Sequence, residues 1–451
     1  MKRKTFIILL FCWVLQGISA QTDTVCSSIG DVIEHIYTYL YADDDTYYTE
    51  LEEELLDLAS HPIALNTATY DELCQLPFLN GTQIDNILLY IHHHPLQSLS
   101  ELRLIDGMEE YDVHFLLPFV CLGDTPRTKT LPAAKVLREG KHEIIMRADV
   151  RDMEGYEGDP VYAQLKYKFN YKNHVQYGLQ LRREPGTRAS DMRYGGYIQL
   201  NDIGHLHTLV AGNYQGQFGM GIVMSNRFHR GKNDYVLSAG TAQEGLRRYT
   251  SVDGEGLHGA GATLRFGKVD VSGFYSLTRA NDSLLRHVVG GNVTFHYRQL
   301  KVGVTAIENI YSDTLRYYNE HTAYNQNYFR GVRQAVIGAN ARWYRGKVDL
   351  FGEIAAAQNK QWGVGIAAGM RITPVSDIGL MALYRYYSPH FDNTLGYAFG
   401  ETVRINDENG LYLSTEIRRL TDWRFSVYAD GFYFTGTKYG ISYAPSWGYD
   451  V

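Results

Sequence analysis

Residues 142–451 alternate apolar and polar side chains with a period of two, and no other feature constrains the fold of this chain as strongly. In the segment 161–171 every odd position is apolar or aromatic, whereas the even positions include Gln164, Lys166 and Lys168. Successive side chains of a β-strand point to opposite faces of its sheet. The pattern therefore predicts about fifteen strands of about ten residues, each with one apolar and one polar face.

Short and long connections alternate between the predicted strands. A tight link such as Gly267-Lys268 contrasts with a long one such as 309–334. Outer-membrane barrels have short periplasmic turns and long outer loops, and about ten residues suffice for a tilted strand to cross the bilayer. We therefore predict an antiparallel transmembrane β-barrel of about 15–16 strands or more over residues 142–451, surrounded by outer-membrane lipid.

The predicted strand count raises a question of closure. Bacterial single-chain barrels have even strand numbers, whereas about fifteen is odd. Either the count misses a strand, or the chain stops short of closure, as a fragment of a longer protein would.

The polar face of each predicted strand would line the barrel lumen. The predicted lumen-facing charges are Lys166, Lys168, Arg182, Arg265, Arg371, Arg385, Glu416, Arg418 and Arg424, and further inward carboxylates are Asp270, Asp349, Glu353 and Asp430. Cations outnumber carboxylates on this face. The excess is consistent with an anion-preferring lumen, but ion pairs between lumen side chains are the interpretation we favour.

The first 20 residues have the pattern of a secretory signal peptide. Lys2, Arg3 and Lys4 precede an apolar run over residues 6–15, and small residues close the segment at Ala20. The run is too short to cross a membrane as a helix, so we expect cleavage after Ala20.

Three cysteines follow this segment, Cys26, Cys74 and Cys121. An oxidising periplasm would permit a disulfide between Cys74 and Cys121, with Cys26 left over. Three free thiols are the alternative, because sequence alone does not assign the pairing.

Residues 21–122 follow the helical period instead. Apolar residues recur at helical spacing over residues 33–58, and a turn and a helix over 73–92 are echoed by a turn and a helix over 102–119. We predict an all-α module here, joined to the barrel by a polar linker over residues 123–141. The chain is then an α+β multidomain protein.

The segments 65–69 and 117–120, with the two helical hairpins between them, resemble a tandem of helix-hairpin-helix motifs of the competence-protein type over residues 61–122. In that family the hairpins bind DNA backbones through turns whose N–H groups meet phosphates at a helix N-terminus. The corresponding turn residues are Pro77, Phe78, Leu79, Asn80 and Gly81 in the first hairpin, and Asp106, Gly107, Met108 and Glu109 in the second.

The charge of the hairpin region opposes DNA binding. Residues 61–122 contain one cation, Arg103, against eight carboxylates, a net charge of −7. Affinity for DNA comes largely from cations that replace counterions at the phosphates. The turns also depart from the glycine pattern of the family at Phe78, Asn80 and Glu109. We therefore expect the module to dock a periplasmic or envelope protein partner or to gate the lumen.

A glycine-rich stretch over residues 212–221 follows one predicted strand and opens the longest predicted loop, 214–256. Together with residues 59–120, it resembles outer-membrane barrels of Bacteroidetes type that carry an N-terminal helix-hairpin-helix region. The resemblance covers most of the chain. It implies an outer-membrane location with the module in the periplasm, rather than a particular activity.

The sequence offers no catalytic set. Histidines in the strand region, such as His258, His287 and His296, are scattered, and no Ser or Cys nucleophile stands in a recognisable setting. We expect no catalytic residue, no cofactor and no metal site. The prediction is a non-enzymatic outer-membrane barrel that acts as a channel or transport component. The alternatives are a competence-like DNA-uptake component that binds nucleic acid, and a surface adhesin or scaffold.

Overall fold

The structure is a computed structural model that describes most of the chain after the predicted signal peptide. It describes residues 29–41, 51–52, 55–56, 58–59, 62–68, 70–73, 75–79, 81–122, 133–150, 161–171, 174–187, 192–225, 232, 244–252, 256–281, 284–316, 322–345, 347–375, 378–402, 404–420, 423–441 and 443–451. The segment 1–20, Cys26, Cys74 and Asn80 lie outside the described residues. Within the described ranges, no helix is long and apolar enough to cross a bilayer.

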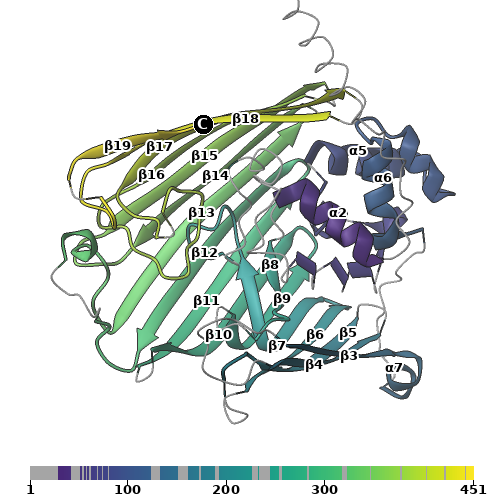
Figure 1. The fold of residues 1–451 in the computed structure, drawn as a ribbon, viewed down its shortest axis with the longest axis horizontal. Coiled ribbons are helices and arrows are strands. Elements are labelled where there is room, and N and C mark those ends of the chain that lie inside the picture. Colours follow the sequence, from purple (N-terminus) through teal and green to yellow (C-terminus); the bar gives the residue numbers. More distant parts are fainter. Residues whose placement is uncertain are drawn as a thin grey trace, which may run out of the picture.

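Seventeen strands, β3 to β19, form the wall of a barrel (Figure 1). They are β3 (Lys141–Val150), β4 (Val161–Tyr171), β5 (Val175–Arg183), β6 (Arg193–Ile203), β7 (Leu206–Gln217), β8 (Gly245–Arg248), β9 (Leu257–Phe266), β10 (Val269–Asn281), β11 (Leu284–Tyr297), β12 (Leu300–Tyr311), β13 (Arg333–Arg345), β14 (Val348–Ala357), β15 (Gly363–Val375), β16 (Ile378–Tyr387), β17 (Glu408–Leu420), β18 (Trp423–Phe434) and β19 (Ser446–Asp450). Neighbouring strands pair antiparallel, and β7 pairs with both β8 and β9. The prediction of an antiparallel barrel wall is confirmed, with two more strands than the count of about fifteen.

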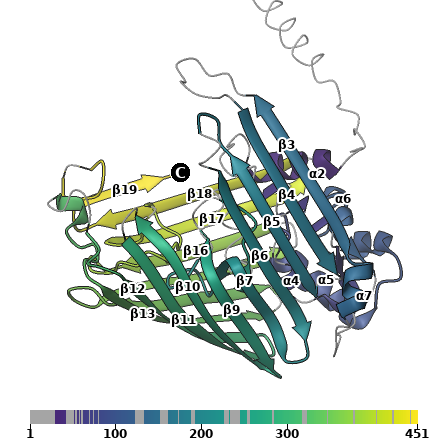
Figure 2. The same cartoon turned by 90° about the horizontal axis from the view of Figure 1, so that it is seen from below.

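The two ends of this wall are β3 and β19, which follow each other in the barrel order. Antiparallel pairing runs from β3 to β4 at one end and from β18 to β19 at the other, but no residue pairing among the described residues joins β19 to β3. The two strands stand apart in Figure 2, and nearly all side chains of β3 are exposed. The barrel therefore has an open seam between its first and last strands.

The wall is apolar outside and polar inside. Outward side chains such as Leu179, Ile354 and Val427 are 64%, 52% and 63% exposed. The side chains that alternate with them are polar and buried, for example Gln164, Asn292, Thr305, Asn340, Asp349, Glu353 and Ser414. This polarity is the reverse of that of a water-soluble sandwich, whose strands bury their apolar face.

The N-terminal described residues form a separate helical unit, which we call the helical module (residues 29–122). Its elements are α2 (Ile29–Tyr41), β1 (Ile63–Ala64), η2 (Leu65–Thr67), α4 (Tyr70–Leu73), α5 (Gly81–His93), η3 (Leu99–Leu104), α6 (Glu110–Leu116), η4 (Leu117–Phe119) and β2 (Val120–Cys121). Strands β1 and β2 pair in parallel and bring the two ends of the hairpin region together. Leu65, Phe78, Ile84, Leu102 and Phe119 are fully buried in its apolar core.

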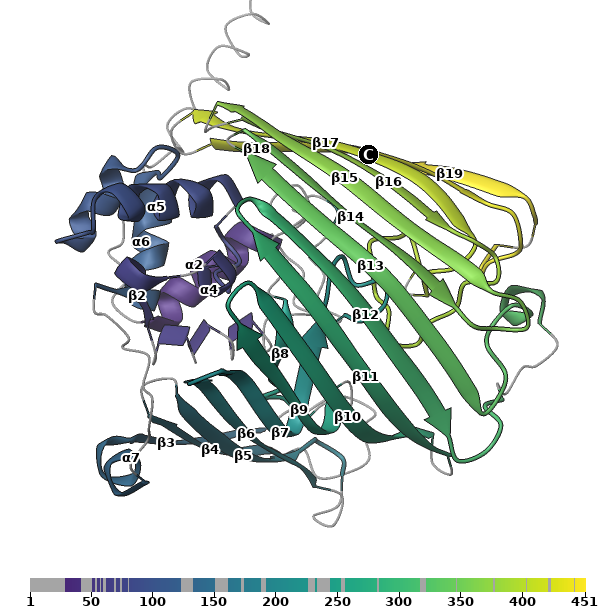
Figure 3. The same cartoon turned by 180° about the vertical axis from the view of Figure 1, so that it is seen from behind.

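The helical module sits at one end of the barrel wall (Figures 1 and 3). The Oγ1 atoms of Thr82 on α5 and Thr373 on β15 lie 2.8 Å apart. Thr373 comes just before the tight connection between β15 and β16. The module therefore lies at the end of the barrel that carries tight turns.

Two segments differ from the sequence predictions. The predicted linker over residues 123–141 contains α7 (Ala133–Glu139), whose Val136 packs on Phe169 and Tyr171 of the wall. One apolar contact thus orders a segment that is polar in composition. The predicted loop 214–256 holds the end of β7 and all of β8, which pair with each other. The pairing covers only four residues, which is too short for a period of two to stand out.

Candidate functional site

Most of the predicted lumen charges are buried on the inner face of the wall. Lys166, Lys168, Arg371, Arg385 and Glu416 are between 0% and 9% exposed. The side chains of Arg182 and Arg265 are 17% and 25% exposed, and each contacts a carboxylate, Glu184 and Asp270 respectively. The side chains of Arg418 and Arg424 lie outside what the structure describes.

A segment directly after β7, residues 218–225, crosses the inside of the barrel. Glu353 of β14, itself 5% exposed, holds it by three backbone N–H groups. Oε2 of Glu353 accepts from the N–H of Met220 at 2.7 Å and of Ile222 at 3.1 Å, and Oε1 accepts from that of Val223 at 3.0 Å. Hydrogen bonds to an ionised carboxylate are stronger than neutral ones. One lumen carboxylate therefore fixes this segment against the wall.

Glycine is required where this segment meets the wall. Gly219 has a φ of +62°, in the left-handed region that other residues avoid. A Cβ there would lie 2.8 Å from Oε2 of Glu353 and from Cβ of Asn340. The close approach of backbone to wall depends on this glycine.

A second segment, the long connection 388–407 between β16 and β17, packs on the first inside the barrel. Nδ2 of Asn393 donates to the carbonyl oxygens of Ile222 and Val223 at 2.8 and 2.7 Å. The backbone N–H of Ser225 donates to the carbonyl of Leu395 at 3.0 Å. Apolar side chains of both segments form one buried cluster, with Phe218, Ile222, Val223, Met224, Phe391, Leu395, Ala398 and Ile405. We call residues 218–225 and 388–407 the plug.

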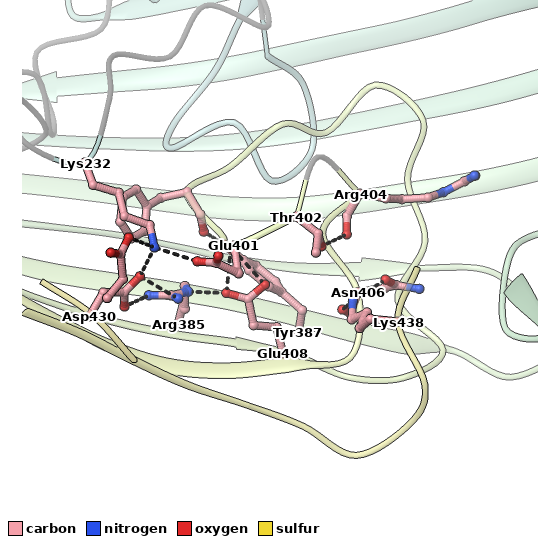
Figure 4. A network of polar contacts seen from close by, with 12 residues as sticks. Lys232, Arg385, Tyr387, Glu401, Thr402, Arg404, Asn406, Glu408, Asp430 and Lys438 are labelled. Carbon is pink, nitrogen blue, oxygen red and sulfur yellow. Dashed lines mark hydrogen bonds and ion pairs between the residues drawn. The ribbon is translucent and has the colours of Figure 1, made fainter. Parts of the chain in front are cut away.

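An ion-pair network ties the plug to strands β16 to β18 (Figure 4). The guanidinium of Arg385 contacts both carboxylate oxygens of Asp430, at 2.6 and 3.0 Å, and its Nε donates to Glu408. The side chains of these three residues are fully buried. Glu408 also accepts from the backbone N–H of Glu401 in the plug at 3.0 Å, and Nζ of Lys232 lies 2.9 Å from Asp430. Wall and plug thus share one charge network.

The inner wall meets the helical module near the tight turn between β13 and β14. On the wall, Asp349 accepts from Arg342 and from Arg371, with Nη2 of each arginine 2.7 Å from Oδ2. This cluster carries two cations and one carboxylate. Asp85 of α5 lies close enough for both arginines to act on its ionisation, and its Oδ1 is buried without a hydrogen-bond partner. Asp85 is therefore a buried carboxyl group placed beside two cations and one carboxylate of the wall.

Burial raises the pKa of Asp85 from 3.8 to about 7, while Arg342 and Arg371 lower it and Asp349 raises it further. Tyr344 is a further titratable group within electrostatic reach of Asp85. The carboxyl group has its ordinary pKa when the module leaves the mouth. At a pH between the free and the docked pKa of Asp85, docking is therefore accompanied by the uptake of a proton.

The docking of the helical module is expected to weaken as pH rises through 7. A group whose pKa is higher in the docked state stabilises docking fully when the pH is below its pKa in the free state. This contribution is lost as the pH rises through its pKa in the docked state. The docking equilibrium should fall about 30-fold between about pH 5.5 and about pH 8. Hydrogen exchange of residues 81–93, corrected for the intrinsic rate, measures this change. The Asp85→Asn variant should lose the pH dependence, and an unchanged slope in that variant would contradict the assignment.

The described residues of the predicted hairpin turns differ in their exposure. Pro77, Phe78, Leu79, Gly81 and Met108 are buried, whereas Asp106 and Glu109 are exposed. Gly107 adopts a φ of +81° at the turn, which suits a glycine.

The two helix starts of the hairpins have partners within the protein. The first turn of α5 holds Thr82 and contacts the barrel through Thr373. At the start of α6 the backbone N–H of Glu109 donates to Oδ2 of Asp112 at 3.1 Å. Gln83 bridges the two, because its Nε2 donates to the same carboxylate oxygen at 2.7 Å. The resemblance places DNA phosphates at these two helix starts. In this protein a barrel contact lies at the start of α5, and a carboxylate lies at the start of α6.

The described residues bear on the predicted disulfide and on metal binding. Cys121 is a free thiol whose Sγ lies 3.7 Å from the carbonyl oxygen of Pro62. A free Cys121 fits the alternative of free thiols rather than the predicted disulfide with Cys74, a residue that lies outside the described ranges. In the described part of the chain, no three His, Cys, Asp or Glu side chains gather in a group that could hold a metal ion.

Sequence reasoning missed the plug and the docking site. Glu353 was placed on the inner face, but its partners are backbone groups about 130 residues away along the chain, as the separations of its bonds show. The glycines of 216–221 were the available signal. The sequence around Arg342 and Asp85 carried no signal of the docking site, because a single charge in a strand or on a helix has many ordinary explanations.

Comparisons with known proteins include distant matches to solved structures. No protein-family model and no curated protein matches the sequence. The outer-membrane-expressed OmpT of Vibrio cholerae is 12% identical with a TM-score of 0.35, over 66% of this chain and 88% of that one. OccK9 (OpdG) of Pseudomonas aeruginosa is 11% identical with a TM-score of 0.37, over 69% and 85%. A mutant of the Rh. blastica porin is 10% identical with a TM-score of 0.30, over 67% and 94%. Similarity this low carries no argument about what this chain does.

Proposed function

We propose that this chain is a non-enzymatic outer-membrane β-barrel that forms a closed conduit, with the plug inside and the helical module at the mouth. The observation that carries the proposal is the seating of the plug on Glu353. Barrels of 16 to 18 strands, roughly, leave an aqueous channel when nothing fills them. A wall of seventeen strands would do so here, and we propose that the plug inside it closes this channel.

A bilayer is the environment that fits the outer face. Large apolar side chains cover the wall on the outside, including Leu165, Leu181, Val289, Val293, Val304, Ile337, Leu350, Leu411 and Leu413. A continuous exposed apolar surface marks an interaction with lipid or protein. Apart from the short β8 and β19, the wall strands have 9 to 14 residues, which matches the length that a tilted membrane strand needs. Lipid is therefore the partner proposed for this face, and the predicted signal peptide accounts for export.

The helical module is proposed to lie in the periplasm, because short turns face that side in outer-membrane barrels. Its contacts with the mouth fit a role in gating or in docking an envelope protein. A catalytic role has little support. Asp270 contacts His296 at 3.2 Å but is also held by Arg265 through both of its oxygens, as in a structural ion pair.

Reconstitution of the full chain in lipid tests this proposal. Tryptophans Trp362 and Trp447 are 58% and 74% exposed, so brominated lipid should quench the fluorescence strongly and water-soluble acrylamide weakly. Planar bilayers holding the same protein should show almost no ion current. Quenching by acrylamide alone would contradict the membrane location. A barrel that conducts ions at rest would contradict the closed state, and one that stays silent after plug release would favour the scaffold alternative.

DNA uptake is the second candidate, and the module argues against it. The full chain is expected not to bind labelled duplex DNA even at about 50 mM salt, because phosphate-dominated binding depends on cations. A shift assay at about 50 and about 200 mM salt measures this. Micromolar binding that falls steeply with salt would contradict the prediction and favour a competence-like component.

A further inference from the structure

Three successive tight turns of the wall carry exposed cations at the same end of the barrel. The β9–β10 turn holds Lys268, the β11–β12 turn holds Arg298, and Arg345 ends β13 just before the β13–β14 turn. Strands β9 to β14 are neighbours in the wall and lie side by side in Figure 3. We call Lys268, Arg298 and Arg345 the basic turn patch.

The carboxylates near these turns have cationic partners of their own. Asp270 lies on the inner face and is held by Arg265 through both of its oxygens. Asp349, also on the inner face, contacts two arginines of the wall. The neighbouring β6–β7 turn holds Asp202, which lies 3.0 Å from His207. Among the described residues, no Asp or Glu forms an ion pair with a member of the basic turn patch. The patch is therefore a region of positive charge at the rim.

Two cations of the patch meet at one aromatic ring. Nζ of Lys268 lies 4.9 Å from the ring centroid of Tyr297, and Cζ of Arg298 lies 5.6 Å from it. The ring of Tyr297 stacks on that of Phe295, with 6.3 Å between the centroids. A cation–π contact positions a cation without neutralising its charge. Lys268 and Arg298 can therefore both turn toward a single anionic group.

The surface beside these two cations is apolar and faces outward. Phe295, Tyr297 and Val293 of β11 are exposed, as are their neighbours Val302 and Val304 on β12. Aromatic rings and long cationic side chains mark the level of the lipid headgroups in membrane proteins, and apolar side chains face the acyl chains. The order of side chains along β11 thus matches the order of groups along one phospholipid molecule.

The backbone of Arg298 indicates that the turn itself does not account for this arginine. Its φ is +52°, in the left-handed region where two-residue hairpin turns favour glycine or asparagine. Gly267 holds the corresponding place in the β9–β10 turn, with a φ of +63°. A glycine at position 298 would suit the backbone better. The arginine is therefore explained by its charge.

We infer that the basic turn patch binds an anionic phospholipid in the leaflet at the tight-turn end of the barrel. Its phosphate would lie between Lys268 and Arg298, and its acyl chains along Phe295 and Val293. Cations near the membrane surface attract anionic lipids. A zwitterionic lipid offers the same phosphate together with a cation that the patch repels. The inference rests on the membrane location proposed above and adds to it the class of lipid that this part of the wall prefers.

Trp343 provides the measurement, because Leu300 faces both Trp343 and Tyr297 and so places them in one row. The full chain is reconstituted in phosphatidylcholine vesicles that contain brominated phosphatidylglycerol or brominated phosphatidylcholine. The difference in fluorescence between the wild type and Trp343→Phe isolates the signal of Trp343. Brominated phosphatidylglycerol should quench this signal with an apparent preference of at least about tenfold over the zwitterionic lipid.

The variants assign the preference to the two cations. Lys268→Gln and Arg298→Gly should each lower it about fivefold. Arg298→Gly should keep the fold, because glycine suits the backbone at this place. Lys360→Gln removes an exposed cation from the β14–β15 connection, at the other end of the barrel, and should leave the preference unchanged. Inorganic phosphate should not displace the brominated lipid, because it has no acyl chains.

Other results would overturn the inference. Equal quenching of Trp343 by the two brominated lipids in the wild type would do so, as would a preference that survives the loss of both cations. Displacement by inorganic phosphate would reassign the patch to a free anion. Trp362 separates the two proposals, because it lies at the other end of the wall. Quenching of Trp362 by brominated phosphatidylcholine, with no preference at Trp343, leaves the membrane location and removes the lipid site. A protein in which no tryptophan is quenched by either brominated lipid contradicts the membrane location itself.

Discussion

Replacing Glu353 with alanine is expected to open the barrel. The variant removes the acceptor of three backbone N–H bonds from Met220, Ile222 and Val223. Each hydrogen bond to a charged group contributes about 1.5–3 kcal/mol, so the closed state should lose at least about 4.5 kcal/mol. The ratio of open to closed barrels should then rise about a thousandfold. Single-channel recording in planar bilayers measures it, at about pH 8, where the helical module is held least firmly.

A matched carboxylate separates this effect from a general loss of charge. Glu308 on β12 is 43% exposed, lies 3.9 Å from Arg333 and takes part in none of the plug contacts given above. The Glu308→Ala variant should give the same single-channel current as the wild type. A silent Glu353→Ala barrel that is correctly folded would show that the carboxylate does not keep the plug in place.

Replacing Arg385 with alanine is expected to cause the largest loss of stability. Arg385 is fully buried between Glu408 and Asp430, and its removal leaves Glu408 without this cation and Asp430 with Lys232 as its remaining ion pair among the described contacts. Breaking a buried pair by removing one partner costs about 3–5 kcal/mol. Because Glu408 also holds the backbone of Glu401, the connection 388–407 should become open to protease as well. Urea unfolding and limited proteolysis of reconstituted protein measure the two effects.

Two comparisons sharpen this prediction. Arg333→Ala removes an arginine whose side chain is 69% exposed and should change stability little. Arg385→Lys keeps the charge but not the fork that grips Asp430, so it should recover only part of the loss. An Arg385→Ala barrel as stable as the Arg333→Ala barrel would show that the network does not hold wall and plug together.

Strand periodicity predicted much of the wall. Lys166 and Arg385 were assigned to the inner face from alternation alone, and both are buried there. Alternation is reliable because a register shift by one residue would move every side chain of the strand to the opposite face of the sheet. The same rule did not find β8, whose four residues hold only two cycles of the pattern.

The plug and the docking site depend on contacts between distant segments. Asn393 reaches backbone carbonyls about 170 residues earlier in the chain, and no local pattern encodes such a bond. Asp85 appears in the sequence as one of many acidic residues in the module. Its role comes from two arginines on β13 and β15 that only the folded barrel brings to it. Local rules therefore predicted the strands, and the tertiary contacts decided what they enclose.

The seating of α5 on the barrel has a consequence for any partner of the module. The helix turn that holds Thr82 and Asp85 is engaged with the wall, so a ligand that needs the same turn competes with the barrel itself. Its apparent dissociation constant is the intrinsic one divided by the undocked fraction. Affinity for such a ligand would then rise with pH as docking weakens. A partner that captured the released module would, by the same equilibrium, leave the mouth uncovered.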